Sequence, residues 1–180
     1  SSNGGLFIYD VSNPRAPVYV GEFDDGGTFN SNFSDVDGDY LYSSECTEGL
    51  KIIDISNPSR PVKVATAAAA NCAYKVTVSN GYAYVGQSTN PYGILVYDVR
   101  QPTNPILRST LFDSNGAQTP GLERHGNYLF AADAGGGLTI YDVSSSTRPI
   151  RVYTEDPIFY SGSDVSVAGS RAFLATNSEL

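Results

Sequence analysis

One motif occurs four times along the 180-residue chain at a constant spacing. Each copy begins with glycine, continues through an apolar run to an aspartate and ends at a proline, and the copies span 5–17, 49–61, 93–105 and 137–149. Their aspartates follow one another at intervals of 44 residues: Asp10, Asp54, Asp98 and Asp142. A period of about 40–45 residues with several short strands per repeat is typical of β-propeller blades. The sequence therefore predicts an all-β chain folded as a β-propeller.

Each 44-residue repeat carries the signals for four strands. The strand before the aspartate is apolar on both faces, as expected where sheets stack on one another around an axis. The closing proline opens an outer strand, and after a variable loop a hairpin with a glycine at its bend follows. The predicted hairpins are 34–42, 76–84, 122–130 and 165–173.

The repeats are out of phase with the ends of the chain. It opens with the last two strands of a blade, over about 5–23, and closes with the first two, over about 163–175, with three complete blades between them. Two arrangements fit residues 1–180: one domain of four four-stranded blades, the fourth completed by both ends of the chain, or part of a larger propeller.

Three motif copies read GLFIYDVSNP, GLKIIDISNP and GLTIYDVSSS, with a hairpin of the form GxYxYV upstream. On these residues, and over essentially its whole length, the chain resembles the LVIVD-repeat family of β-propellers. The resemblance implies a propeller of bacterial or archaeal proteins that are often exported or surface-attached, and it implies no shared catalytic residues. The departures are Ser146 in place of proline, Arg100-Gln101 in place of Ser-Asn, and Arg124 in place of valine.

Charge and composition limit the classes of molecule that the chain is expected to bind. A net charge of −8 argues against nucleic acid, because phosphate binding needs a basic patch. No apolar run approaches the roughly 18–20 residues that span a bilayer, so we expect no membrane insertion. Few lysines and many tyrosine, serine and glycine residues favour a secreted or cell-surface protein.

Loops on one rim form the predicted binding surface. The loops before each motif and after each outer strand lie on the same face of an up-and-down blade, and loops on a rigid scaffold often carry function. We expect a protein or glycan partner there, or self-association, with a solvated acidic loop face as the alternative. The candidate residues are Asp24, Asp25, Phe29, Glu45, Tyr92, Asp133, Phe159 and Tyr160.

Cys46 and Cys72 fall on this rim, and both a disulfide and two free thiols fit their spacing. A Cys-His enzyme is disfavoured because His125 sits at a hairpin bend that faces the other way. The acidic segment 35–39 resembles the start of a calcium loop, but Tyr40 and Cys46 stand where that loop needs glycine and glutamate. We therefore interpret it as a hairpin turn and expect no cofactor, with calcium as the alternative.

The repeated aspartates Asp10, Asp54, Asp98 and Asp142 occupy one place in every repeat, which predicts turn caps rather than catalytic carboxylates. The sequence shows no assembled base–nucleophile pair and no metal-ligand set. We therefore expect a non-catalytic extracellular or cell-surface propeller that serves as a binding or assembly scaffold. The alternatives are a propeller enzyme of the hydrolase or lactonase kind with a metal in its central channel, and a structural subunit of a filament or surface assembly.

Overall fold

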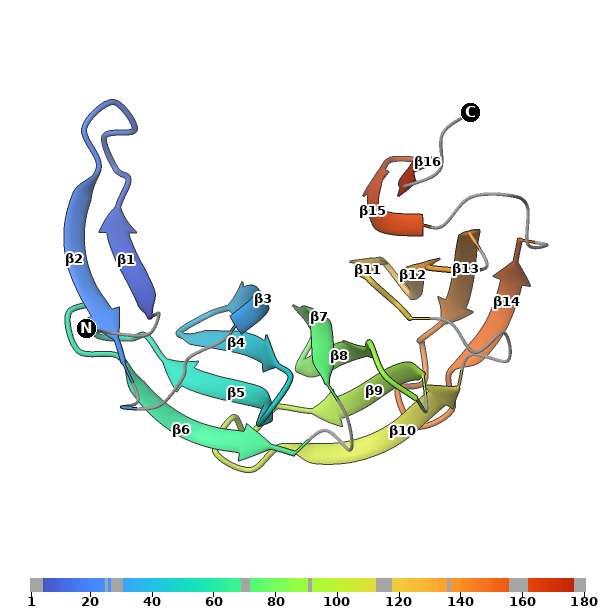
Figure 1. Ribbon diagram of the computed structural model, residues 1–180, viewed down its shortest axis with the longest axis horizontal. Coiled ribbons are helices and arrows are strands. Elements are labelled where there is room, and N and C mark those ends of the chain that lie inside the picture. Colours follow the sequence, from blue (N-terminus) through green and yellow to red (C-terminus); the bar gives the residue numbers. More distant parts are fainter. Residues whose placement is uncertain are drawn as a thin grey trace.

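The computed structural model describes residues 5–24, 26, 31–68, 72–90, 92–112, 118–135, 137–155 and 162–176. Within these residues the chain is all-β, with sixteen antiparallel strands in five sheets that follow one another around an open arc (Figure 1). Three sheets have four strands and two sheets, one at each end of the arc, have two. The propeller fold expected from the 44-residue repeat is confirmed.

Each four-stranded sheet is one blade. The first blade has β3 (Ser31–Asp37), β4 (Tyr40–Glu45), β5 (Gly49–Asp54) and β6 (Val62–Ala67). The second has β7 (Ala73–Ser79), β8 (Tyr82–Gln87), β9 (Gly93–Asp98) and β10 (Ile106–Phe112), and the third has β11 (Gly121–His125), β12 (Tyr128–Asp133), β13 (Gly137–Asp142) and β14 (Ile150–Thr154). In every blade the strands pair in chain order, with the first strand on the concave side of the arc and the fourth on the convex side (Figure 1).

The two-stranded sheets are half-blades. The N-terminal half-blade, β1 (Leu6–Asp10) and β2 (Val18–Phe23), corresponds to the outer strands of a blade, and the C-terminal half-blade, β15 (Gly162–Ala168) and β16 (Arg171–Thr176), corresponds to the inner strands. They lie at opposite ends of the arc (Figure 1), and among the described residues β1 pairs only with β2 and β16 only with β15. Among the described residues the two half-blades are therefore separate sheets and do not pair with each other.

The inner hairpins turn where the sequence placed their bends. Gly38, Gly126 and Gly169 have φ near +60°, and Asn80 stands at the equivalent place with φ 53°. Asparagine is among the few residues with a side chain that enter this left-handed region readily, so the turn geometry is the same in all four hairpins.

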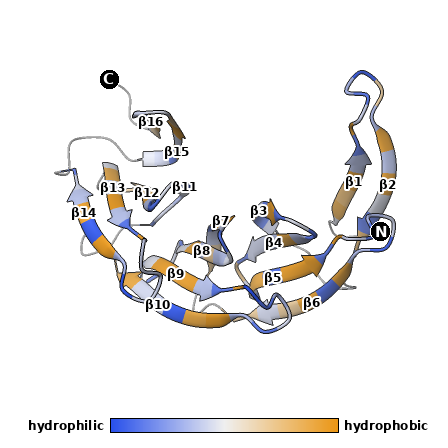
Figure 2. Cartoon of the chain, turned by 180° about the vertical axis from the view of Figure 1, so that it is seen from behind, coloured by the Kyte–Doolittle hydropathy of each residue, from blue (hydrophilic) through white to orange (hydrophobic). Residues whose placement is uncertain are grey.

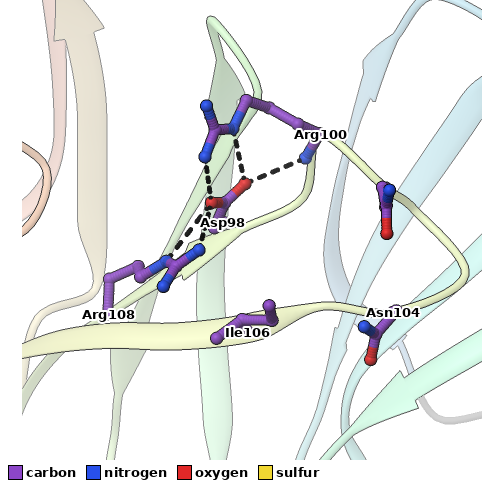
Figure 3. Close-up of a pocket in the computed structure, with 6 residues that line it drawn as sticks. Asp98, Arg100, Asn104, Ile106 and Arg108 are labelled. Carbon is purple, nitrogen blue, oxygen red and sulfur yellow. Dashed lines mark hydrogen bonds and ion pairs between the residues drawn. The ribbon is translucent and has the colours of Figure 1, made fainter.

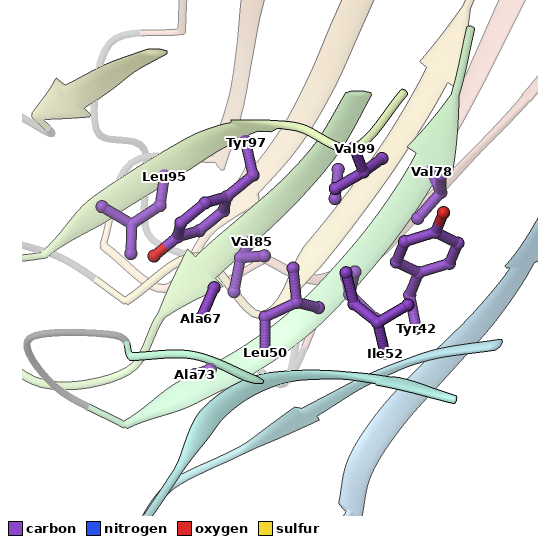
Figure 4. Packing of buried hydrophobic residues seen from close by; sticks show 12 residues of the cluster. Tyr42, Leu50, Ile52, Ala67, Ala73, Val78, Val85, Leu95, Tyr97 and Val99 are labelled. Atoms are coloured by element: carbon purple, nitrogen blue, oxygen red, sulfur yellow. The ribbon is translucent and has the colours of Figure 1, made fainter. Parts of the chain in front are cut away.

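Apolar side chains are buried between the blades. Tyr42, Leu50 and Ile52 of the first blade pack against Leu95 and Tyr97 of the second (Figure 4). A second cluster joins the second blade to the third in the same way. The apolar faces of β5 and β9 therefore lie between neighbouring sheets, as their two-sided pattern predicted.

The outer strands lie on the convex side and carry both hydrophilic and hydrophobic residues (Figure 2). Each pairs with its neighbour through a register shift that leaves one residue bulged: Val20, Val64, Arg108 and Val152. A bulge increases local twist and can redirect a side chain, which matters at Arg108. Within the described residues no helix is long and apolar enough to cross a membrane.

Candidate functional site

The inner strands present one equivalent position near the rim of the arc, and it carries a different residue in each repeat. The position is Phe33 in β3, Lys75 in β7, Gly121 in β11 and Asp164 in β15. Phe33, Gly121 and Asp164 face equivalent residues of the following strand, and Lys75 lies in a register shift of β7. We call these four residues the axial belt.

Lys75 contacts two other residues of the axial belt, Phe33 and Asp164. Its ammonium Nζ lies 4.6 Å from the centroid of the Phe33 ring and 3.1 Å from Oδ1 of Asp164. The Phe33 ring also meets the Tyr74 ring edge-to-face, with centroids 5.1 Å apart. Lys75 is mostly buried, whereas more than half of the Asp164 side chain is exposed. The belt and the neighbouring Tyr74 therefore place an aromatic pair, a cation and an anion side by side on the concave side of the arc.

Gly121 makes this arrangement possible. A Cβ built on Gly121 would lie 2.6 Å from the Cα of Asp164 and 2.9 Å from the Cβ of Ala132. Any side chain would therefore push β15 away from β11. With none present, Lys75 reaches across the third blade to Asp164.

The rim beside the axial belt is cross-linked. Cys46, between β4 and β5, forms a disulfide with Cys72, which directly precedes β7 in the next blade. The Asn32 amide donates to the carbonyl of Ala73 at 2.9 Å, and the Ser44 hydroxyl donates to the carbonyl of Tyr74. These contacts fix the start of β7, and with it Lys75, against the first blade.

Inner-strand carboxylates join the first blade to the second and the third blade to the C-terminal half-blade. Asp35 Oδ2 accepts the N–H of Val78 at 2.8 Å, and Glu123 Oε2 accepts the N–H of Val167 at 3.0 Å. Asp35 Oδ1 also accepts the N–H of Val36. Both oxygens of Asp35 thus hold backbone donors, and the segment 35–39 forms the β3–β4 hairpin. Among the described residues, no three His, Cys, Asp or Glu side chains come together as a metal site requires.

The structure corrects part of the predicted rim surface. Glu45 and Asp133 are buried rather than presented to solvent, together with Gln87 at the equivalent place in the second blade. Asp24 is exposed and accepts the N–H of Gly26 at 2.9 Å, and Tyr92 is partly buried. The remaining candidates lie outside the described residues: Asp25, Phe29, Phe159 and Tyr160.

Glu45 and Asp133 are the last residues of the second strands of their blades and do not lie in loops, and both have polar partners. Glu45 Oε2 lies 3.0 Å from Nζ of Lys51, which is buried as well, and Lys51 also contacts Glu48 at 3.2 Å. Asp133 Oδ1 accepts the hydroxyl of Thr119 at 3.4 Å. Because these carboxylates are held inside blades, they act on stability and are not presented to a partner.

The four motif aspartates form turns. The N–H two residues onward donates to Oδ1 of each, at 2.8 Å for Asp10, 2.9 Å for Asp54, 3.2 Å for Asp98 and 2.9 Å for Asp142. Hydrogen bonds to the charged form favour it, so the pKa of each carboxyl is lowered.

Asp98 differs from the other three because two arginines surround it (Figure 3). Arg100 donates to both carboxylate oxygens, with its Nη2 at 2.6 Å from Oδ2, and the bulged Arg108 places its Nη2 at 2.8 Å from the same Oδ2. The Arg100 hydrogen bond is the largest cause that holds the pKa of Asp98 well below its usual range. These groups, with Gln101, Asn104 and Ile106, line an open cavity of about 440 Å³.

Sequence reasoning missed the axial belt, although a signal for it exists. When the hairpins are aligned on their glycine or asparagine bends, one column reads Phe33, Lys75, Gly121 and Asp164, while the next column is mostly apolar. Arg100 was visible as a departure from the motif, but Arg108 was not, because its contact with Asp98 depends on the bulge in β10.

A family model described as the LVIVD repeat matches residues 1–25, 35–67, 72–112 and 121–154. No curated protein matches the chain.

Among solved structures, the computationally designed Ika4 protein superposes with a TM-score of 0.68 at 9% identity, over 84% of this chain and 88% of Ika4. The computationally designed Ika8 protein superposes with a TM-score of 0.74 at 8% identity, over 98% of this chain and 51% of Ika8, so the chain spans about half the length of Ika8. The N-terminal domain of Nup159 superposes with a TM-score of 0.55 at 12% identity, over 84% of this chain and 40% of that domain. At these identities the likeness concerns the fold alone.

Proposed function

The chain belongs to the LVIVD-repeat family, and on this premise we propose that it is a non-catalytic β-propeller scaffold that binds a protein or glycan partner outside the cell. The observation that carries the proposal is the axial belt. There the four repeats share one backbone position, and its residue is an aromatic ring, a cation, a glycine or an anion depending on the repeat. The residue at this position differs in all four repeats, and variable positions on a rigid scaffold are where binding surfaces are commonly built.

The chemistry of the axial belt suits a partner with both apolar and charged groups. Phe33 and Tyr74 are partly buried, so each ring is fixed but leaves some of its surface open. Lys75 and Asp164 offer donors and acceptors within the same small area. Aromatic residues are enriched in the centres of protein interfaces, and hydroxyl-rich sugars need paired donors and acceptors.

The inner-strand carboxylates support a scaffold over the alternative of a metal-dependent enzyme. A catalytic carboxylate must be free to take a proton or bind a metal. Asp35 and Glu123 instead accept backbone N–H groups of the following blade. Over the described ranges they therefore act as connectors between blades.

The disulfide between Cys46 and Cys72 supports a site outside the cell. Disulfides persist in oxidising compartments and are rare where thiol reductants are abundant. A propeller whose rim is cross-linked beside its binding position also keeps that position rigid, which lowers the entropic cost of binding.

The experiment is a binding screen followed by two variants, each of which removes one charge of the Lys75–Asp164 ion pair. The purified chain is applied to a glycan array and to an array of extracellular proteins, and each hit is measured by titration calorimetry with wild type, Lys75→Ala and Asp164→Asn. Loss of an interface anchor costs about 1 kcal/mol or more of binding free energy, so we expect at least that loss in both variants.

Arg148→Ala is the matched control. Arg148 is exposed in the turn between β13 and β14, which faces away from the axial belt, so its removal should leave affinity unchanged. Hits that bind all three variants as tightly as wild type would show that the axial belt is not the binding surface. Turnover of any arrayed substrate would contradict the non-catalytic assignment.

A further inference from the structure

The N-terminal half-blade exposes a face that complete blades bury. Tyr9 in β1 is 53% exposed, whereas its equivalents Ile53 in β5 and Tyr97 in β9 are 0% and 4% exposed. Phe7 on the same face is also exposed, whereas its equivalent Leu95 is buried. In complete blades this face packs on the preceding blade, and among the described residues no blade precedes β1.

The C-terminal end of the arc has the complementary deficiency. Phe173 in β16 is 58% exposed, whereas its equivalents Tyr42 and Tyr84 are 3% and 1% exposed. Leu138 and Ile140 in β13, which should be covered by the outer half of a following blade, are only partly buried. The missing cover is an outer pair of strands, which is what β1 and β2 are.

The free edges of β1 and β16 match in register. In each complete blade the first residue of the second strand pairs with the motif aspartate: Tyr40 with Asp54, Tyr82 with Asp98 and Tyr128 with Asp142. The same register would place Arg171 of β16 opposite Asp10 of β1. Opposite charges in directly facing cross-strand positions stabilise the pair, and this repeat alone has arginine in place of tyrosine.

The share of Ika8 that the chain covers and the count of its sheets indicate how many copies close a ring. Nearly the whole chain superposes on about half of Ika8. One copy contributes three complete blades and two half-blades of opposite kind, so two copies supply six blades and two composite ones. A two-fold axis would use the same contact twice, which is the usual symmetry of a closed dimer.

We propose that two copies of the chain close an eight-bladed ring, in which β15–β16 of each copy and β1–β2 of the other form one four-stranded blade. The Phe7 and Tyr9 face of one copy then covers Leu138 and Ile140 of the other, and Phe173 packs on the first blade of the other copy. Unpaired strand edges, which invite uncontrolled association, disappear on closure. This inference is independent of the axial belt and of the proposed partner.

The first test is cross-linking in the expected register. Tyr9→Cys and Ala172→Cys would face each other across the new strand pair, and both positions are exposed in the single chain. After mild oxidation, non-reducing gels should show a covalent dimer of twice 19.2 kDa. Tyr9→Cys with Phe173→Cys is the matched control, because a shift of one residue places the thiols on opposite faces and should give little cross-link.

The cross-linking pattern and the mass of the wild type in solution distinguish a closed dimer from other assemblies. A dimer from the in-register pair alone, with a wild-type mass of a dimer by light scattering at ~100 μM, as expected for a dissociation constant in the micromolar range, supports the closed ring. A cross-link within one chain would show closure by a single copy, and a ladder of larger species would show a filament. Either result, or a wild-type monomer without cross-link, would overturn the proposal.

The second test exchanges the charges. Arg171→Asp should raise the dissociation constant of the dimer at least ~10-fold, since two like-charge pairs then oppose closure, and ten-fold corresponds to about 1.4 kcal/mol. Asp10→Lys added to Arg171→Asp should restore most of the affinity. Asp54→Lys removes the same kind of turn cap inside a complete blade away from β13, and it should leave the dimer intact. Absence of rescue, with the control unaffected, would contradict the register.

Discussion

Lys75 Nζ lies 3.1 Å from Asp164 Oδ1, so one ion pair joins the inner strands of two sheets that are separated by a complete blade. Exposed ion pairs contribute only about 0–1 kcal/mol to stability, and Asp164 is mostly exposed. The pair is therefore better understood as a means of orienting Lys75 on the concave side. Its geometry depends on the close approach of β15 to β11 at Gly121.

Gly121→Ala is expected to destabilise the protein by about 1–3 kcal/mol, because overpacking a close backbone contact forces the strands apart. The new Cβ would meet the Cα of Asp164 at 2.6 Å, and backbone cannot move aside as a flexible side chain can. Urea unfolding followed by circular dichroism measures the loss.

Gly126→Asn is the control for Gly121→Ala in the same hairpin. Nothing lies within 4 Å of a Cβ at Gly126, and asparagine already occupies the equivalent turn position at Asn80. Its unfolding midpoint should stay close to wild type, within about 0.5 kcal/mol. Equal losses in the two variants would mean that crowding at Asp164 is not the cause.

Asp98→Asn is expected to lower the free energy of unfolding at neutral pH and to lower it less at acidic pH. The pKa of Asp98 is lowered from 3.8, first by the Arg100 hydrogen bond, so its stabilisation is complete above that value and is lost as pH falls through the lower folded-state pKa. Hydrogen bonds to charged groups contribute roughly 1.5–3 kcal/mol, which sets the expected loss at pH 7. Unfolding free energies of wild type and variant, measured from pH 7 down to pH 2, should converge.

Asp142→Asn gives the comparison for Asp98→Asn. Asp142 accepts the same turn N–H, and among the described residues no arginine binds its carboxylate, so its loss at pH 7 should be the smaller one. Identical pH profiles for the two variants would show that Arg100 and Arg108 add nothing to the cap.

Replacing Cys46 and Cys72 by serine is expected to lower the free energy of unfolding by about 3.5 kcal/mol. The bond closes a loop with a sequence separation of 26 residues, and the loss follows from the chain entropy that a cross-link of this length removes from the unfolded state. Thermal unfolding of wild type with and without reductant measures the same quantity independently. A reductant effect that persists in the serine variant would assign the change to something other than this bond.

The repeat made most of the fold predictable from the sequence. The predictions that were wrong or missing have physical causes. The hairpin bends, the outer strands and the turn aspartates follow from local chemistry that occurs in every unit, so a pattern reveals them. Glu45 and Asp133 were assigned to loops because they directly precede the motif strands, whereas the second strands extend to these residues and bury them beside polar partners. The contact of Lys75 with Asp164 could not be read from sequence, since it depends on the curvature of the arc.

Lys51→Met is expected to cost about 3–5 kcal/mol, because it removes the ammonium 3.0 Å from Glu45 Oε2 in a place where both side chains are buried. The position lies on the face where Phe7, Leu95 and Thr139 stand in the other repeats, so methionine fits the apolar surroundings in shape. The loss should therefore come from the charge left on Glu45. Adding Glu45→Gln removes that charge, and the double variant should regain most of the stability in urea unfolding at pH 7. If Lys51→Met alone cost less than about 1 kcal/mol, the ion pair would not be what keeps this carboxylate inside the first blade.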